Sequence, residues 1–182
     1  RRERINGKMP MLSKPMQDAL NCQINVEFAS ANQYLALSAF FERINMKGCA
    51  HWMRIQHEEE LAHGMKILDY IHDRDGEVTI GTVEAPDTNW GTPQEGFQAA
   101  LDGERQNSKQ IGDLVELATS EKDHSTHAFL QWFVNEQIEE EATAQDIIDK
   151  LTFVGDDRTG QFMIDQELAQ RVPPPETQAE QD

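Results

Sequence analysis

Four segments of this chain place a polar side chain that could bind a metal ion where an apolar one is expected. The four residues are Glu27, Glu60, Glu104 and Gln137, and each has an apolar or aromatic residue seven positions away on both sides. Residues seven apart share one face of a helix, so these side chains point toward the same interior as the leucines around them. A buried carboxylate is costly unless it is protonated, paired or bound to a cation. Few basic residues lie on these faces, so the pattern predicts a metal site.

The second of these segments also carries a histidine, because Glu60 and His63 form a Glu-x-x-His pair. This spacing on a helix lets one carboxylate and one imidazole reach the same ion. The motif is weak by itself, since Glu121 and His124 have the same spacing where a turn is predicted. A pair on the helix surface is therefore the alternative for Glu60 and His63. Buried acids at matching depth on the other segments favour the metal site.

Carboxylates and an imidazole are ligands that suit ferrous iron and similar ions, and a bridging carboxylate can hold two metal ions about 3.5 Å apart. Glu60 is the predicted bridge because it is the central acid of its segment. Glu27 and His63 then complete one metal site, and Glu104 completes the other. Such a mixed ligand set leaves open positions where dioxygen can bind.

The elements that position these residues are predicted to be helices. Apolar periodicity and end signals predict helices over residues 13–45, 47–75, 93–120 and 123–152, with a short fifth helix over 156–170. Short links make the first and second helices, and the third and fourth, antiparallel neighbours. The link over 76–92 can reach about 55 Å, which exceeds the ~42 Å length of the second helix. The fold class is therefore all-α: a four-helix bundle with a long crossover that brings the polar residues to similar heights.

Composition is that of an acidic protein with one domain. The chain has 182 residues and a formal net charge of -17, which argues against a nucleic-acid surface and favours small cations as partners. No apolar run approaches the ~20 residues that cross a bilayer, so we expect no membrane association and a cytoplasmic location. Cys22 and Cys49 lack metal-binding or redox spacing and are expected to be reduced, buried thiols.

The two ends differ from the middle of the chain. Residues 1–10 carry four basic residues against one acid, and we expect a disordered basic extension there, with a DNA-binding or targeting arm as the alternative. Residues 172–182 hold three consecutive prolines and a polar tail, which cannot continue a helix and are expected to be disordered. The predicted folded domain spans residues 11–171.

The residue set resembles that of the non-haem bacterial ferritins. The matching residues are Glu27, Tyr34, Glu59, Glu60, His63, Glu104, Glu136, Gln137, Glu139 and Glu140, together with the stretch 129–137. The resemblance covers residues 11–171 and implies a ferritin-like bundle whose short fifth helix packs around the fourfold axes of a shell of twenty-four subunits. It also implies ferroxidase activity: Fe²⁺ is oxidised by dioxygen inside each subunit and stored as an Fe³⁺ mineral.

The resemblance also assigns the individual iron sites. It implies that Glu27, Glu60 and His63 form the first site. Glu60 and Glu104, with Gln137 more loosely, form the second site. A third, nearby site seen in some bacterial members matches another group of residues: Glu59, Glu136, Glu139 and Glu140.

Two departures separate the chain from the haem-containing bacterioferritins. That branch repeats the Glu-x-x-His motif on its fourth helix, where this chain reads Gln137 to Glu140. It also has a haem-ligating methionine directly after the bridging glutamate, where this chain has Leu61. Haem is therefore not expected. The Dps mini-ferritins differ more, since two of their subunits share the iron ligands and they lack the fifth helix.

Several alternatives stay open at the level of sequence. Tyr34 is either a hydrogen-bonding or one-electron partner of the iron centre or a core tyrosine, and Trp132 is expected to be core packing. The acidic runs 58–60 and 139–141 could be an ordinary solvated face or an inner shell surface that nucleates mineral. A di-iron oxidase acting on an organic substrate is the alternative function, and a metal-free acidic interaction bundle is a third.

Overall fold

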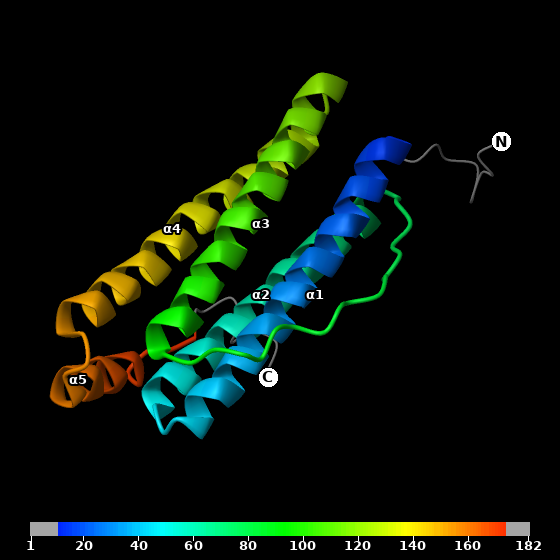
Figure 1. Ribbon diagram of the computed structural model, residues 1–182. Coiled ribbons are helices and arrows are strands. Elements are labelled where there is room, and N and C mark those ends of the chain that lie inside the picture. Colours follow the sequence, from blue (N-terminus) through cyan, green and yellow to red (C-terminus); the bar gives the residue numbers. More distant parts are fainter. Residues whose placement is uncertain (1–10, 174–182) are drawn as a thin grey trace.

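The computed structural model describes residues 11–173 of the chain, and five α-helices make up most of this part (Figure 1). The helices are α1 (Lys14–Arg43), α2 (Lys47–Asp73), α3 (Pro93–Glu121), α4 (His124–Val154) and α5 (Arg158–Leu168). The described residues contain no strand, so the all-α prediction is confirmed. The predicted basic extension over 1–10 and residues 174–182 of the predicted tail lie outside the described residues.

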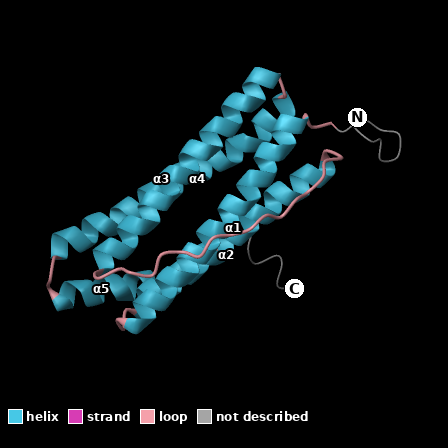
Figure 2. Ribbon diagram, turned by 45° about the vertical axis from the view of Figure 1, so that its right-hand side comes forward, coloured by secondary structure: helices cyan, strands magenta, loops and turns pink. Residues whose placement is uncertain are grey.

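The four long helices form the predicted bundle, in which α1 packs against α2, α3 against α4, and α1 against α3 (Figures 1 and 2). The connection after α2 runs along the outside of α1 for the length of the bundle, so α2 and α3 point in the same direction. Helix α5 lies across one end, against α2 and α4. None of the described helices is long and apolar enough to span a membrane.

Asparagine side chains of α1 hold the long connection in place. The Thr79 amide donates to Asn21 Oδ1 at 2.7 Å, and the Gly81 amide donates to Asn25 Oδ1 at 2.8 Å. The Asn21 side chain also donates to the carbonyl oxygen of Glu77 at 2.9 Å. The backbone of this extended segment is therefore satisfied by a helix surface and needs no partner strand.

The helix starts are set by capping residues that the sequence already displays. Ser13, Thr92 and Asp123 accept hydrogen bonds from the backbone amides at the starts of α1, α3 and α4. Helix α2 ends at Asp73, two residues before the predicted end, because Asp75 has a left-handed backbone. The Gly76 amide then donates back to the Ile71 carbonyl at 2.8 Å, which terminates the helix near the predicted glycine.

The start of α2 is capped by a residue that is distant in the sequence. No side chain at the start of α2 caps it, but Asp165 of α5 accepts a hydrogen bond from the Cys49 amide at 2.9 Å. Gly48 makes this approach possible, because a Cβ atom there would lie 1.7 Å from the Asp165 carbonyl oxygen. Helix α5 is thereby fixed against the first turn of α2.

Two apolar clusters fill the bundle, one toward α5 and one toward the opposite end. The first contains Tyr34, Phe41, Trp52, Phe97 and Leu151 among others, and the second contains Leu20, Ile24, Ile67, Ile111 and Phe133 among others. Buried polar residues lie between the clusters on all four long helices. Each cluster covers one side of this polar layer, so the polar side chains of the layer are removed from water.

The prediction of buried thiols holds for one cysteine and is wrong for the other. Cys49 is buried, whereas Cys22 is exposed, and both are free thiols. Cys22 is two residues from both Leu20 and Ile24, which are completely buried. Two residues correspond to roughly 200° around a helix, so Cys22 lies on the opposite side of α1 from the core.

Candidate metal centre

Glu60 and His63 of α2 point into the polar layer together with Glu27 of α1. Ligand atoms of all three residues lie within 4.8 Å of one another, and the side chains are almost completely buried. Neither carboxylate oxygen of Glu60 accepts a hydrogen bond from a donor in the described part of the chain, and the same is true of His63 Nδ1. Buried polar atoms are rarely left without partners, so an unpartnered carboxylate beside an unpartnered imidazole nitrogen indicates a cation site.

Glu104 of α3 and Gln137 of α4 complete the opposite side of the layer. Gln137 Nε2 donates to Glu104 Oε2 at 3.0 Å and to the Glu104 carbonyl oxygen at 3.2 Å. The hydroxyl of Tyr34 donates to the other Glu104 carboxylate oxygen. Glu104 and Gln137, predicted to share the second site with Glu60, thus bind each other, and Tyr34 is hydrogen-bonded to Glu104. The charge of Glu104 acts on Glu60, but Glu104 does not belong to the group of ligand atoms formed by Glu27, Glu60 and His63.

Burial dominates the electrostatics of the centre. It raises the pKa of Glu27 and Glu104 above the usual range of a carboxyl group. It raises the pKa of Glu60 further, helped by the charges of Glu104 and Glu27. Burial lowers the pKa of His63 to about 4, with a smaller contribution from Lys66, so the imidazole is neutral near pH 7. A divalent cation would replace the protons on the carboxyl groups and bind a neutral imidazole.

Two amide side chains that the sequence analysis did not single out hold Glu27. Gln23 Nε2 donates to Glu27 Oε1 at 2.7 Å, and Asn107 Nδ2 donates to Glu27 Oε2 at 3.2 Å. Gln23 Nε2 also lies 2.6 Å from Asn107 Oδ1, which joins α1 to α3. The sequence spacing does indicate both residues. Gln23 lies four residues before Glu27 and Asn107 lies three residues after Glu104, so each shares a helix face with a proposed ligand.

The residues predicted for a third site are only partly brought together. Ligand atoms of His63, Glu136 and Glu140 lie within 4.8 Å of one another. The charge of Glu136 also acts on Glu59 of α2, but Glu59 Oε2 accepts a hydrogen bond from Arg171 at 2.6 Å. Glu139 is exposed and lies outside the group. The structure therefore places two of the four predicted acids, Glu136 and Glu140, with His63, pairs Glu59 with Arg171, and exposes Glu139 to solvent.

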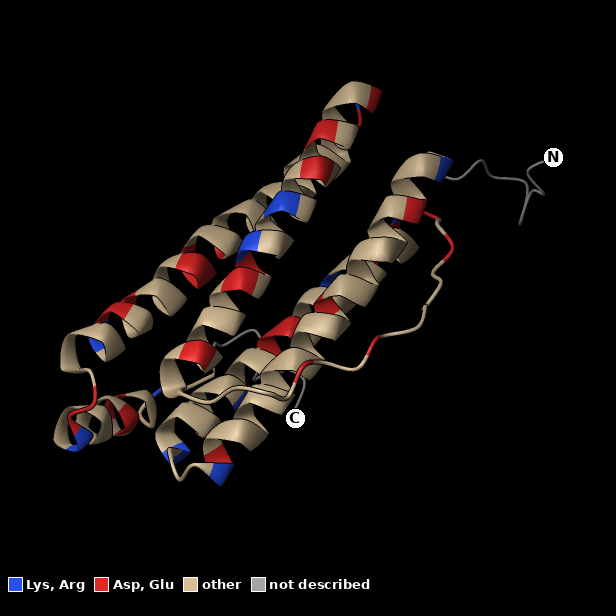
Figure 3. Ribbon diagram, in the orientation of Figure 1, with Lys and Arg blue, Asp and Glu red and all other residues tan. Residues whose placement is uncertain are grey.

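The pKa values of this acidic group are also raised. Burial, followed by the charges of Glu104 and Glu59, raises the pKa of Glu140 to about 8, while a hydrogen bond from Gln56 at 2.7 Å opposes the increase. Burial raises the pKa of Glu59 to about 7, against the effect of Arg171. Acidic residues far outnumber basic ones along the bundle, which adds to the attraction for cations (Figure 3).

Other candidate residues behave as ordinary structural groups. Glu121 accepts a hydrogen bond from the Ser13 hydroxyl at 2.5 Å, and His124 is exposed, so their Glu-x-x-His spacing belongs to no metal-binding group of the described residues. Trp132 is half-buried and presents its ring edge-on to His63, with the ring centroids 5.2 Å apart. Lys66 lies 3.8 Å above the Trp132 ring. Trp132 thus packs against His63 and against the edge of the second apolar cluster.

Known proteins are similar to this chain over most of its length. The family model of the ferritin-like domain matches residues 17–154. A bacterial non-haem ferritin from Bacteroides fragilis is 45% identical over 161 residues, which are 88% of this chain and 100% of that protein. One from Staphylococcus epidermidis is 40% identical over 161 residues, which are 88% of this chain and 97% of that protein.

Solved structures agree with the sequence comparison. An open pore ferritin from the hyperthermophilic archaeon Archaeoglobus fulgidus has a TM-score of 0.87 and 43% identity, over 88% of this chain and 99% of that one. A humanized archaeal ferritin has a TM-score of 0.89 and 42% identity, over 90% of this chain and 99% of that one. Sequence and structure agree over most of the chain, and it therefore belongs to the ferritin family, with the bacterial non-haem ferritins among its relatives.

Proposed function

We propose that this protein stores iron by oxidising Fe²⁺ with dioxygen at the buried centre and keeping the Fe³⁺ product as a mineral inside a protein shell. The observation that carries the proposal is the set of unpartnered ligand atoms on Glu60 and His63, with Glu27 close enough to share an ion with both. Family membership supports the same reading, because the relatives are named non-haem ferritins.

Each ligand has a role that follows from its position. Glu60 bridges two iron ions in this proposal, because its ligand atoms form a group with those of Glu27 and His63 and the charge of Glu104 also acts on its carboxyl group. Glu27 and His63 complete the first ion, and Glu104 completes the second with looser help from Gln137. Two Fe²⁺ ions lose one electron each, and these two electrons, with two protons, reduce one dioxygen to hydrogen peroxide. The carboxylates bind the resulting Fe³⁺ more strongly than Fe²⁺ because of its higher charge.

A third iron ion binds beside the pair in this proposal. Glu136 and Glu140, one turn apart on α4, hold it together with Glu59 of α2. Glu139 was predicted to belong to this site and is exposed next to it. Changing both Glu136 and Glu139 to alanine should alter how iron leaves the centre, while the first rapid oxidation survives. Anomalous maps of iron-soaked crystals that show only two ions per subunit at saturation would remove the third site.

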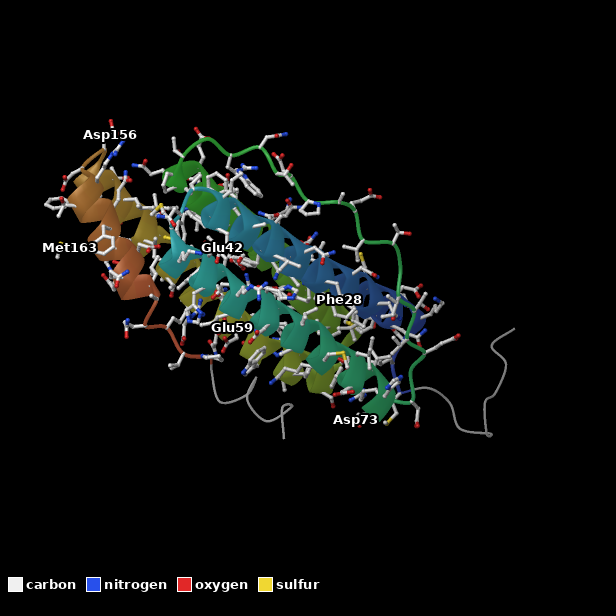
Figure 4. All side chains as sticks on the ribbon, turned by 90° about the horizontal axis from the view of Figure 1, so that it is seen from below. Phe28, Glu42, Glu59, Asp73, Asp156 and Met163 are labelled. Atoms are coloured by element: carbon white, nitrogen blue, oxygen red, sulfur yellow. The ribbon has the colours of Figure 1, made fainter. Side chains whose placement is uncertain are left out.

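Storage requires a closed assembly, which we propose contains twenty-four subunits and lies in the cytoplasm. Large apolar residues on the outer faces of the described chain support self-association. They form one group on α1 and α2 and another at the α5 end: Leu35, Leu61, Met65, Phe153, Phe162 and Met163. Met163 points away from the bundle in Figure 4. Assembly would cover such residues.

A di-iron oxidase acting on an organic substrate is the alternative, and particle size separates it from a shell. A cavity of about 250 Å³ is lined by Cys22, Val26 and Leu117 among others, and one of about 590 Å³ by Leu35, Ser38 and Arg54 among others. Neither of these two cavities is lined by a candidate metal ligand, so neither offers an organic substrate access to the metals.

Two measurements on the purified full chain test the proposed function. Size-exclusion chromatography with light scattering should give a particle of roughly half a megadalton, as expected for twenty-four chains of 20.7 kDa. Stopped-flow absorbance after addition of Fe²⁺ in air should show rapid oxidation that saturates at two ions per subunit. A particle of one or two chains, or oxidation no faster than in buffer, would overturn the proposal.

A further inference from the structure

Arg171, just beyond α5, brings a positive charge onto the acidic group of the third site. Its Nη2 atom lies 2.6 Å from Glu59 Oε2. The charge acts beyond that pair, since it also opposes the increase in the pKa of Glu140. Glu59 is thus already paired with the Arg171 guanidinium, although the proposed third iron ion would need Glu59 as a ligand.

Packing of α5 and the segment after it against α2 holds Arg171 beside Glu59. The contact between the two residues therefore does not depend on one flexible side chain alone. His51 Nε2 of α2 lies 2.9 Å from the Arg171 carbonyl oxygen. The guanidinium carbon lies 4.6 Å above the ring of Trp52, also on α2. Upstream, the cap from Asp165 and the absence of a side chain at Gly48 fix α5 against the start of α2. The chain leaving α5 is thereby directed along α2 to Glu59.

We propose that Arg171 is a displaceable counter-cation of the third iron site, so that iron must move the guanidinium away from Glu59 in order to bind there. This inference rests on the proposed function. It assigns to the segment 169–173 a role in setting the affinity of the third ion, separate from the two ions that are oxidised first.

The structure shows why the contact can be displaced. The salt bridge joins one nitrogen to one oxygen, and Nη1 of Arg171 has no hydrogen-bond partner among the described residues. The Arg171 side chain is 23% exposed, against 6% for Glu59, so the arginine lies nearer to solvent than the acid does, although its Nη1 atom is buried. A divalent ion that also binds Glu136 and Glu140 has twice the charge and more ligands.

The test titrates the assembled shell with Zn²⁺, which binds carboxylates and imidazoles but is not oxidised. Arg171→Gln keeps a polar side chain and removes the charge. We expect calorimetry to show the weakest of three equivalents per subunit binding about tenfold more tightly in this variant, as expected from loss of one partly exposed charged hydrogen bond. The first two equivalents should not change. Arg54→Gln, at an exposed arginine of α2, is the matched control and should behave as the wild type.

A second variant separates the effect of the Arg171 charge from the effect of moving the segment after α5. His51→Ala removes only the anchor of the Arg171 backbone, and it should tighten the third equivalent by less than Arg171→Gln does. Crystals of the wild type soaked in Zn²⁺ should show an ion on Glu59 and the guanidinium withdrawn from it.

Several results would overturn the proposal about Arg171. They are an unchanged or weaker third equivalent in Arg171→Gln, no third equivalent in either protein, or an ion on Glu59 with the salt bridge intact. Rapid Fe²⁺ oxidation by the same wild-type shells would show that the proposed function stands in spite of such a result. Slow oxidation, in contrast, would count against the function itself, whatever the Zn²⁺ titration shows.

Discussion

The Oε2 atom of Glu60 lies 3.9 Å from the Nδ1 atom of His63. This distance is too long for a hydrogen bond, but it suits two ligands of one ion, because each ligand atom lies about 2.1 Å from a bound metal such as zinc. Glu60 and His63 are nearly free of solvent, and no described donor reaches either Glu60 oxygen. The geometry therefore matches a site arranged around an ion that both side chains share.

Glu60→Ala should nearly abolish rapid Fe²⁺ oxidation, because both proposed iron ions lose their common ligand. The shell should still assemble, since removal of a buried acid exposes no apolar surface. Stopped-flow absorbance measures the rate, and light scattering measures assembly. Glu58→Ala is the matched control, since Glu58 is exposed on the same helix and should keep the wild-type rate. Rapid oxidation by assembled Glu60→Ala shells would rule out the bridging role.

Asn107→Ala should weaken binding of the first ion about 10- to 100-fold, the usual cost of losing a group that orients a metal ligand. Asn107 donates to Glu27 and also accepts from Gln23, so the variant releases both side chains from their present positions. Calorimetric titration with Zn²⁺ is the measurement. Gln106→Ala, at the exposed neighbouring position, should leave the affinity unchanged. Equal affinities for the two variants would mean that the amide does not orient Glu27.

Tyr34→Phe should slow oxidation by up to about tenfold, because Glu104 loses a hydrogen bond to a buried carboxylate. Assembly should survive, since the ring keeps its edge-on contact with Trp52 at 6.3 Å between centroids. Rapid-freeze electron paramagnetic resonance adds a second readout: a tyrosyl signal in the wild type that disappears in the variant would identify Tyr34 as a one-electron partner. A wild-type rate in Tyr34→Phe would leave Tyr34 as a core residue only.

Affinity for divalent cations should fall as the pH is lowered from about 8 to about 6, because protons compete for the same carboxyl groups. The pKa of Glu140 is about 8 and that of Glu59 about 7, so both bind protons within this range. All three Zn²⁺ equivalents should weaken, since burial raises the pKa of carboxyl groups at each of the proposed sites. Calorimetry at several pH values, corrected for buffer ionisation, is the measurement. An affinity independent of pH would contradict a site rich in protonated carboxyl groups.

The metal-free protein should become more stable as the pH falls from about 8.5 to about 6.5. In the unfolded chain Glu140 and Glu59 have pKa values near 4.5, whereas in the folded protein these are about 8 and 7. The folded state therefore binds more protons in this range. This contribution to stability is complete below the unfolded pKa and is lost as the pH rises through the folded values. The pKa of His63 is lowered on folding, so this histidine has the opposite effect on stability, but only below its unfolded pKa of 6.5.

Thermal unfolding of metal-free shells measures this effect, and the midpoint should rise by a few degrees across that range. Glu140→Gln removes one of the two groups, so the dependence on pH should become shallower. A midpoint that falls steadily as the pH is lowered would show that the buried carboxyl groups are ionised in the folded protein.

The helices and most of the proposed iron ligands could be predicted from the sequence because both depend on local spacing. Seven-residue periodicity places Glu27, Glu60 and Glu104 on core faces, and the structure confirms that all three are buried. Caps such as Ser13 and Thr92 act within one turn, so they mark the helix starts in the sequence itself. The long crossover sets the helix directions through its length alone.

Only the tertiary structure decided which distant residues meet. Arg171 and Glu59 are 112 positions apart, and Asp165 and Cys49 are 116 apart. No periodicity connects such residues, because their contact depends on where α5 comes to lie against α2. The same limit applies to Glu139, which shares a charge run with Glu140 but faces solvent. Local spacing fixes the face of a helix on which a side chain lies, whereas packing decides what that face meets.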